Sequence, residues 1–256
     1  MELMPKAVQS RYPAPVAKSN HKPVQLTAGE AALLLDVQGG RRLVRRGQEI
    51  ISERKPCTAL FIINEGVCIR YRVLRDGQRH ILNIVLPGDF AGIPSCFFDS
   101  ALYSVKTLTD AVVSPVPLHH LVKLFDTNPR LAAKLFWSFA CEAAIYAEHV
   151  IAVGRRPALE RIAHFLLELL TRLQAIGLAN ERSYHLPITQ EILSDALGLS
   201  IPYVNRVLRQ LRDDGLVNIK DHNIIIHDVD ALASLADFER AYLNPLSIAD
   251  LLSADD

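Results

Sequence analysis

The sequence has few cysteines, and their spacing excludes two common kinds of scaffold. The 256 residues include four cysteines, and no two of them form a CxxC pair. A disulfide framework or a zinc ribbon requires paired or closely spaced cysteines, so the pattern predicts neither. We expect Cys57, Cys68, Cys96 and Cys141 to be buried free thiols, and no adjacent positive group favours Cys96 as a redox sensor.

Long apolar runs and an excess of charge are also absent. No stretch approaches the length of a transmembrane helix and the N-terminus has no apolar signal core, which predicts a cytoplasmic protein without a membrane partner. The 28 Lys and Arg residues balance the 28 Asp and Glu residues, so the chain has no uniformly basic coat. Basic residues nevertheless outnumber acidic ones over residues 1–75. A local DNA-binding surface is therefore compatible with the balanced charge.

Motifs that carry enzyme chemistry are missing as well. The sequence contains no Gly-rich phosphate loop, no paired metal-ligand motif and no nucleophile elbow, which predicts that the protein is not an enzyme. His119 and His120 are adjacent, and neighbouring residues of a helix point in different directions. We therefore expect these histidines to be solvated or capping residues and predict no metal site.

The stretch from Thr189 to Asp214 is the most informative part of the chain, because it has the pattern of two helices joined by a tight turn. Thr189 is suited to cap the first helix and Gly198 to end it. Ser200 is suited to cap the second helix, with Pro202 in its first turn. Apolar residues at helical spacing give each helix a buried side, and those expected to hold the motif together are Leu193, Leu197, Val204 and Leu208.

The other side of the second helix carries arginines, with no acidic residue between Ser200 and Arg212. In a helix-turn-helix this helix enters the major groove, where an arginine reaches guanine O6 and N7 and a capping hydroxyl binds phosphate. We expect Arg206 to contact a base. The hairpin-like run over residues 215–228 predicts a wing with Lys220 and His222 near its tip. The residues expected to contact phosphate or neighbouring bases are Thr189, Gln190, Ser200, Tyr203, Asn205 and Arg209.

These features resemble the winged-helix DNA-binding domain of the Crp/Fnr family of bacterial transcription regulators. Members commonly read TQE-x-LA-x-x-LG-x-S-x-x-x-VNR-x-L, which this sequence matches closely over residues 189–208. The resemblance implies a homodimer that binds double-stranded DNA at a two-fold-symmetric site. The sequence departs from the pattern at Ile192, and at Ile201 and Pro202, where some members place base-reading Arg and Glu. The DNA target of a relative therefore does not transfer to this chain.

The N-terminal half shows a different pattern. From Arg41 to Pro117 short apolar or alternating runs are separated by glycine turns, with Asp76-Gly77 as a hairpin signal, which predicts antiparallel strands. The order of Gly47, Gly66, Asp76-Gly77 and Gly88-Asp89-Phe90 resembles the cyclic-nucleotide-binding domain that forms the sensory half of Crp/Fnr proteins. The likeness covers about residues 30–238. It implies an α+β fold with an N-terminal antiparallel β-roll, a long dimerisation helix and a C-terminal winged helix-turn-helix.

The resemblance also bears on the effector. Members that bind a cyclic nucleotide carry a Glu for the ribose and an Arg for the phosphate after the Gly-Asp-Phe turn. Here Ile93 and Pro94 stand near the Glu position and no arginine occurs from His80 to Pro129, so we expect no usual binding of cAMP or cGMP. No cysteine before Cys57 could hold an Fnr-type iron–sulfur cluster. The candidate effector pocket comprises Gly88, Asp89, Phe90, Gly92, Ser95 and Tyr103.

The loop that contains these residues is apolar. It suits a pocket filled by its own side chains, the alternative we favour, or a pocket that holds haem or a small apolar effector. Two other functions remain open at this stage. One is a signalling module whose helical half does not bind DNA, and the other is a haem-based gas or redox sensor of the same family.

A long helix is expected after Asn128 and Pro129, reaching Val153. An apolar seam at spacings of four and three indicates pairing with a second copy, whereas Leu131, Leu135 and Ile145 form a flank suited to pack on the roll. Residues Gly154 to Pro157 are the expected hinge. The seam comprises Ala132, Phe136, Phe139, Ala143, Tyr146, Val150 and Val153.

The predicted organisation has five parts. They are a mobile arm at 1–25, a sensor roll at 26–127 that begins with a helix from Thr27 to Val37, a dimerisation helix at 128–154, a winged helix-turn-helix at 155–238 and an acidic tail at 239–256. Three roles remain open for the tail: covering an apolar patch, contacting RNA polymerase, or neither.

Overall fold

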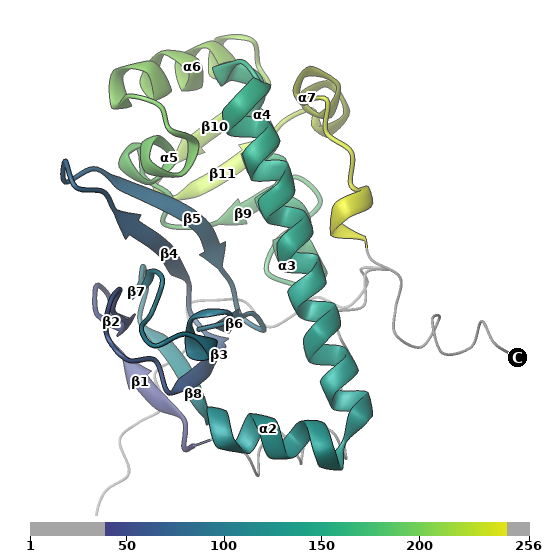
Figure 1. Cartoon of the computed structure of the whole chain (residues 1–256). Helices are drawn as coiled ribbons and strands as arrows, with labels where there is room; N and C mark the ends of the chain where they lie inside the picture. Colours follow the sequence, from purple (N-terminus) through teal and green to yellow (C-terminus); the bar gives the residue numbers. More distant parts are fainter. Residues whose placement is uncertain (1–38, 245–256) are drawn as a thin grey trace, which may run out of the picture.

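The chain forms an N-terminal β-roll and a C-terminal helical half, with one long helix between them (Figure 1). The computed structural model describes residues 39–244. The predicted arm, the predicted helix from Thr27 to Val37 and residues 245–256 of the tail lie outside the described residues. Within the described part, the predicted α+β fold class is confirmed.

The roll consists of two four-stranded antiparallel sheets, with the strand orders β1-β8-β3-β6 and β2-β7-β4-β5. As predicted, Asp76-Gly77 turns β4 into β5: Gly77 has a φ of 85°, and the Asp76 carboxylate accepts a hydrogen bond from the backbone N–H of Gln78 at 3.0 Å. The strands are β1 (Arg42–Val44), β2 (Glu49–Ile51), β3 (Ala59–Glu65), β4 (Cys68–Val73), β5 (Arg79–Val85), β6 (Phe90–Ala91), β7 (Ser104–Thr107) and β8 (Ala111–Pro117).

Strand β4 separates two hydrophobic cores, because successive side chains point to opposite faces of a sheet. Cys68 belongs to the core inside the roll. Ile69 and Tyr71 belong to a second core, which continues from the outer face of β4 and β5 into the helical half. The two halves of the molecule therefore share one continuous apolar cluster.

Three helices follow the roll: α2 (Leu118–Thr127), α3 (Pro129–Arg155) and α4 (Ala158–Ala175). Arg156 and Pro157 separate α3 from α4, because proline disfavours helical backbone in the residue before it. The predicted break after Val153 falls two residues later, since Gly154 and Arg155 are still helical. Across residues 39–244, no helix is long and apolar enough to cross a membrane.

The helical half is a winged helix. Helices α5 (Gln190–Leu197), α6 (Ile201–Asp213) and α7 (Val229–Ala236) pack against α4 or one another. A three-stranded sheet of order β10-β11-β9 combines β9 (Ser183–His185), β10 (Val217–Lys220) and β11 (Asn223–Ile226). The predicted wing hairpin is confirmed as β10 and β11, whereas the three-residue β9 was too short for the sequence pattern to reveal.

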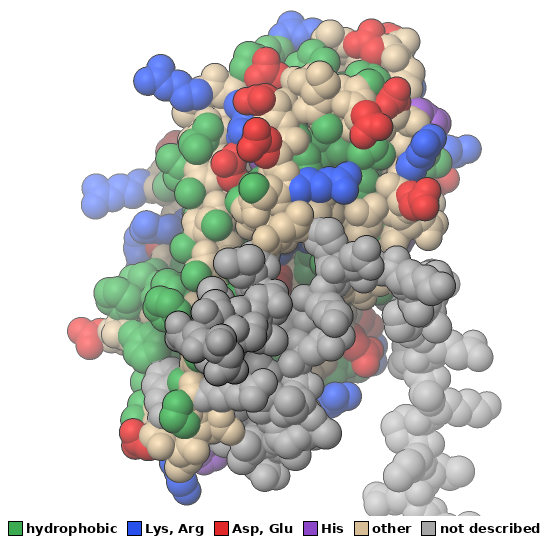
Figure 2. All heavy atoms as spheres, turned by 90° about the vertical axis from the view of Figure 1, so that its right-hand side faces the viewer, with side chains coloured by type: hydrophobic (Ala, Val, Ile, Leu, Met, Phe, Trp, Pro, Cys, Tyr) green, Lys and Arg blue, Asp and Glu red, His purple; other side chains and the backbone are tan. Residues whose placement is uncertain are grey.

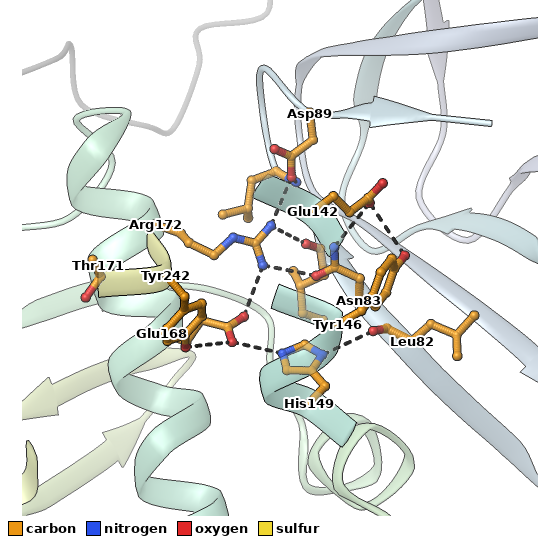
Figure 3. Close-up of polar contacts among 12 residues, drawn as sticks. Leu82, Asn83, Asp89, Glu142, Tyr146, His149, Glu168, Thr171, Arg172 and Tyr242 are labelled. Atoms are coloured by element: carbon orange, nitrogen blue, oxygen red, sulfur yellow. Dashed lines mark hydrogen bonds and ion pairs between the residues drawn. The ribbon is translucent and has the colours of Figure 1, made fainter. Parts of the chain in front are cut away.

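A largely buried arginine on α4 fastens the helical half to the roll (Figure 3). Arg172 donates hydrogen bonds to the Asn83 side-chain oxygen at 3.0 Å, to the Ile84 carbonyl at 2.8 Å and to the Asp89 carboxylate at 3.0 Å. All three acceptors belong to β5 or to the turn after it. Arg172 is only 10% exposed, so loss of its partners would leave a largely desolvated charge unpaired, and this contact holds α4 to the sheet.

Glu168 stands one turn before Arg172 on α4 and is fully buried. Its carboxylate lies 2.9 Å from Nε2 of His149 on α3 and accepts a hydrogen bond from the Tyr242 hydroxyl at 3.2 Å. Tyr242 lies in the short turn η2 (Ala241–Leu243), so part of the predicted acidic tail covers the α3–α4 junction. The junction therefore gathers charged or hydrogen-bonding groups from the roll, α3, α4 and the segment after α7.

Two histidines at this junction have pKa values shifted in opposite directions. Burial disfavours the charged form of His149, but the Glu168 carboxylate outweighs it and raises the pKa of His149. Burial, helped by the charge of Arg156, lowers the pKa of His164 on α4 to about 4. The junction thus favours the cation of His149 and the neutral ring of His164.

The two histidines should affect stability with opposite pH dependence. The His149 contribution is full below its unfolded pKa of about 6.5 and is lost as pH rises through the raised folded pKa. The His164 contribution is full above about 6.5 and is lost as pH falls towards about 4. We expect His149→Gln to cost more free energy of unfolding at pH 6 than at pH 8.5, measured by urea denaturation.

His164→Gln is the matched control, and it should cost less at pH 6 than at pH 8.5, by about 1 kcal/mol. Glu168 has a lowered pKa and is ionised at both pH values, so it does not contribute to either difference. Equal costs of His149→Gln at the two pH values would contradict a charged His149.

Candidate nucleic-acid interface

The turn between α5 and α6 is fixed by local hydrogen bonds and one glycine. As predicted, the Thr189 hydroxyl caps α5 by accepting a hydrogen bond from the backbone N–H of Ile192 at 3.2 Å. Gly198 ends α5 with a φ of 61°, a left-handed conformation that favours glycine. The Ser194 hydroxyl then donates to the Leu199 carbonyl across the turn. These contacts hold α6 at the angle to α5 that a helix-turn-helix requires.

Ser200 stands at the N-cap position of α6, but the predicted side-chain cap was wrong. A capping hydroxyl accepts from the second or third N–H of the helix. The second residue is Pro202, which has no N–H, and the N–H of Tyr203 donates to the Ser200 carbonyl at 3.0 Å. The exposed Ser200 hydroxyl is therefore free to meet a phosphate at the positive end of the helix.

Helix α6 has one buried side and one charged side. Arg206, Arg209 and Arg212 are exposed, and none of them forms an ion pair with a carboxylate in residues 39–244. Unpaired arginines on one side of a helix leave the counter-charge to a ligand, and a nucleic-acid backbone supplies it. The side chains buried against α4 and α5 are Val204, Val207 and Leu211.

A groove of about 870 Å³ lies between α5, α6 and the wing. Asp221 and His222 at the wing tip line its far side. Tyr203 and Arg206 are not part of the lining, and the Arg206 guanidinium lies 4.2 Å from the centroid of the Tyr203 ring. The predicted DNA contacts are thus divided between two flanks of α6. Those that line the groove are Thr189, Gln190, Asn205 and Arg209.

The wing is a tight hairpin. Asp221 and His222 form its tip with φ values of 50° and 64°, and Lys220 next to them is exposed. The missed strand β9 pairs with β11, and the His185 ring lies 3.1 Å from the Asn223 side-chain oxygen. The third strand stiffens the wing and fixes its tip beside the groove.

The roll touches the helix-turn-helix directly. Arg79 at the start of β5 pairs with Asp195 at 2.6 Å and with Glu191 at 3.0 Å, both on α5. On α4, Arg161 donates to the Leu197 carbonyl at the end of α5 at 2.6 Å. No local sequence pattern reveals this role of Arg79, because its partners lie 112 and 116 residues away along the chain.

The predicted effector pocket contains an arginine from outside the predicted segment. Arg70 of β4 is 0% exposed. Its guanidinium donates to the Phe90 carbonyl at 3.0 Å and lies 4.8 Å from the Tyr103 ring centroid. It also donates to the Glu142 carboxylate and the Tyr146 hydroxyl on α3. Burial disfavours its charge, but Glu142 and the tyrosines outweigh burial and raise the pKa of Arg70.

The other candidate pocket residues serve the loop or the domain junction. Gly88 has a φ of 94°, and a Cβ at Gly92 would lie 3.1 Å from the Leu60 Cα. The Ser95 hydroxyl accepts a hydrogen bond from the backbone N–H of Leu102 at 3.1 Å. Asp89 binds Arg172 of α4, which links the turn after β5 to the domain junction.

The aromatic residues of this loop face in two directions. Tyr103 is buried and donates a hydrogen bond to the Ile93 carbonyl. Phe97 and Phe98 are exposed, so they do not fill a pocket inside the roll. Phe97 ends a one-turn 3-10 helix (η1, Ser95–Phe97), and Phe98 is the residue after it.

The seam on α3 is exposed at most of its predicted positions. Phe136 and Val150 are each 73% exposed, and Phe139 and Ala143 are also exposed. Tyr146 departs from the seam, because its hydroxyl is bonded to Arg70 inside the roll. In Figure 2, hydrophobic side chains gather along the left margin, the side that faces the viewer in Figure 1.

A β-roll, a long helix with an exposed apolar seam and a winged helix with unpaired arginines define a DNA-binding regulator with a sensory domain. Residues 41–128 match the cyclic nucleotide-binding domain family, and residues 160–235 match the Crp-like helix-turn-helix domain family. The chain belongs to the Crp/Fnr family of transcription regulators, and it is a DNA-binding regulator, not an enzyme.

Relatives in this family cover most of the chain. The nitrogen fixation regulation protein FixK of Bradyrhizobium diazoefficiens is 30% identical over 200 residues, which cover 76% of this chain and 83% of that protein. Electron transport regulator A of Shewanella oneidensis is 26% identical over 221 residues, which cover 85% of this chain and 88% of that protein. The solved structure of FixK2 from Bradyrhizobium japonicum superposes with a TM-score of 0.69 at 29% identity, covering 77% of this chain and 96% of that one.

Arg206 is expected to carry base recognition, because its guanidinium is exposed and has no carboxylate partner among the described residues. Arg206→Ala should cost about 1–3 kcal/mol of binding to the specific site and relax specificity at one position. A competition titration of specific against random duplex measures this difference. Equal weakening on both duplexes would show that Arg206 contacts only the backbone.

Proposed function

We propose that the protein binds a two-fold-symmetric DNA site as a homodimer, and that it does so without a cyclic nucleotide. The observation that carries the second part is the fully buried Arg70. Its two terminal nitrogens are engaged by Glu142, Tyr146 and the Phe90 carbonyl, and its Nε has no partner in the described chain. A cyclic phosphate needs a charge-assisted donor, and this arginine is already committed to Glu142.

The same contacts support a filled sensor in preference to haem or a small apolar effector. The guanidinium stacks against the buried Tyr103 ring and reaches α3, so one side chain spans the space between the effector loop and the long helix. If one member of a buried ion pair is removed, the other is left as an uncompensated charge, which costs about 3–5 kcal/mol. An uncharged ligand that separated Arg70 from Glu142 would have to offset that cost.

The homodimer is supported by the exposed seam on α3. Phe136, Phe139 and Val150 are large apolar side chains that the described chain leaves in water. Large exposed apolar side chains along one helix mark an interaction surface, and a two-fold partner presents the same surface in return. A symmetric dimer places two α6 helices on half-sites about one DNA turn apart.

We also propose RNA polymerase as a partner and the cytoplasm as the location. A regulator bound beside a promoter acts by favouring or hindering polymerase, so the two proteins must share one compartment with DNA.

DNA selection from a random fragment pool, with purified protein and no added ligand, should recover a two-fold-symmetric site. Saturating cAMP should leave both DNA affinity and the unfolding midpoint unchanged, because only a ligand that binds the folded state raises that midpoint. A cAMP-dependent rise in the midpoint would contradict the filled sensor. A haem-like absorbance spectrum would contradict it as well and would identify haem as the effector.

Phe136→Glu should convert the protein to a monomer, because it places a charge in the proposed apolar seam. Sedimentation measures the mass, and affinity for the two-fold site should fall about a hundredfold or more as the second half-site is lost. Leu43→Glu, at an exposed apolar residue of β1, is the control and should remain dimeric. A Phe136→Glu protein that stays dimeric would place the interface elsewhere.

A further inference from the structure

Tyr203 is a large aromatic residue on the recognition helix that packing does not explain. It is 37% exposed, whereas the buried side of α6 is formed by Val204, Val207 and Leu211. Residues three apart on a helix are neighbours, and Arg206 follows Tyr203 at this spacing. The guanidinium lies 4.2 Å from the ring centroid, within the range of a cation–π contact.

A stacked guanidinium keeps its recognition edge free. The N–H groups of arginine lie in the plane of the guanidinium, so a ring over one face does not block them. Guanine O6 and N7 require two of these N–H groups in a fixed orientation. A free arginine side chain has many rotamers, and ordering them opposes binding, whereas a stacked one has fewer to lose.

A second arginine, Arg161 of α4, is anchored at the hinge and at the end of α5. Burial lowers the pKa of Arg161, and Tyr203 lies near enough to oppose that shift. Arg161 donates to the Val153 carbonyl near the end of α3 and to the Arg156 carbonyl, both at 3.0 Å, and to the Leu197 carbonyl at 2.6 Å. Arg161 is thus held by three backbone carbonyls, whereas the Arg206 guanidinium is held, among the described residues, only by the Tyr203 ring.

We propose that Tyr203 is a positioning residue for base recognition, whose ring holds the Arg206 guanidinium in the orientation that reads a guanine. This inference rests on the proposed function, in which Arg206 contacts a base. In this proposal the aromatic ring of Tyr203 orients Arg206, and the Tyr203 hydroxyl takes no part. The two residues should therefore act as one unit.

The test compares Tyr203→Leu and Tyr203→Phe, each with Arg206 present and with Arg206→Ala, on the selected duplex and on a shuffled duplex. Tyr203→Leu should weaken binding to the selected duplex about fivefold, the factor that corresponds to about 1 kcal/mol for an exposed cation–π pair. Binding to the shuffled duplex and the salt dependence should not change, because in this proposal Tyr203 acts through Arg206 and not through the phosphate contact considered for it from the sequence. Tyr203→Phe should stay within about twofold of the parent protein on both duplexes.

In the Arg206→Ala background, Tyr203→Leu should have no further effect, since the ring then has nothing to hold. The inference is overturned if Tyr203→Phe loses as much as Tyr203→Leu, which would mean that the hydroxyl contacts DNA. It is overturned equally if Tyr203→Leu costs fivefold without Arg206. Tyr203→Gln repeats the measurement with a polar side chain in case the leucine variant does not fold.

The failure of this inference and the failure of the proposed function are distinguishable. If Arg206→Ala alone leaves the base preference unchanged, then Arg206 does not read a base and the underlying assignment fails. If Arg206→Ala relaxes the preference at one position but Tyr203→Leu does not weaken specific binding, only the positioning role fails.

Discussion

Two opposite charges, Glu168 and Arg172, are carried by α4 into the region where the roll and the helical half meet. An unpaired charge in such a place costs several kcal/mol, so every partner must be present in the folded protein. The partners come from β5 and the following turn, from α3 and from the segment after α7. Correct pairing of these charges therefore requires that all four parts of the chain be in place at once.

The same pairing of charges also fixes the position of the DNA-binding surface. Helix α4 is anchored to the roll by Arg172, and α5 and α6 pack on α4. Arg79 reaches α5 from the roll, and Arg161 ties the end of α5 to the hinge. The orientation of α6 is thus set by ionic and hydrogen-bonded contacts that begin in the sensory half, and a change in the roll has a short physical route to the recognition helix.

Local signals explain what the sequence alone could predict. The cap at Thr189, the glycine at Gly198 and the apolar spacing of α5 and α6 act over a few residues, so the helix-turn-helix and the hairpin at Asp76-Gly77 were predictable. The role of Arg70 was not, because its charge partner Glu142 is 72 residues away. Tyr146 was assigned to the seam by its heptad position, and Asp89 to the pocket by its loop. In each case a distant arginine determined where the side chain points.

The continuous core on the outer face of β4 and β5 limits how freely one half of the protein can be replaced by the corresponding half of a relative. Ile69, Tyr71 and Ile81 share one cluster with residues of α4, α5, α6 and the wing, although the chain crosses from one half to the other only at the hinge. The hinge is the point at which the chain passes from one half to the other, but the hydrophobic cluster extends across both halves. A chimera that took its winged helix from another family member would also need the outer face of that member's β4–β5 hairpin. The reason is that the sheet surface and the helices packed on it are complementary in shape.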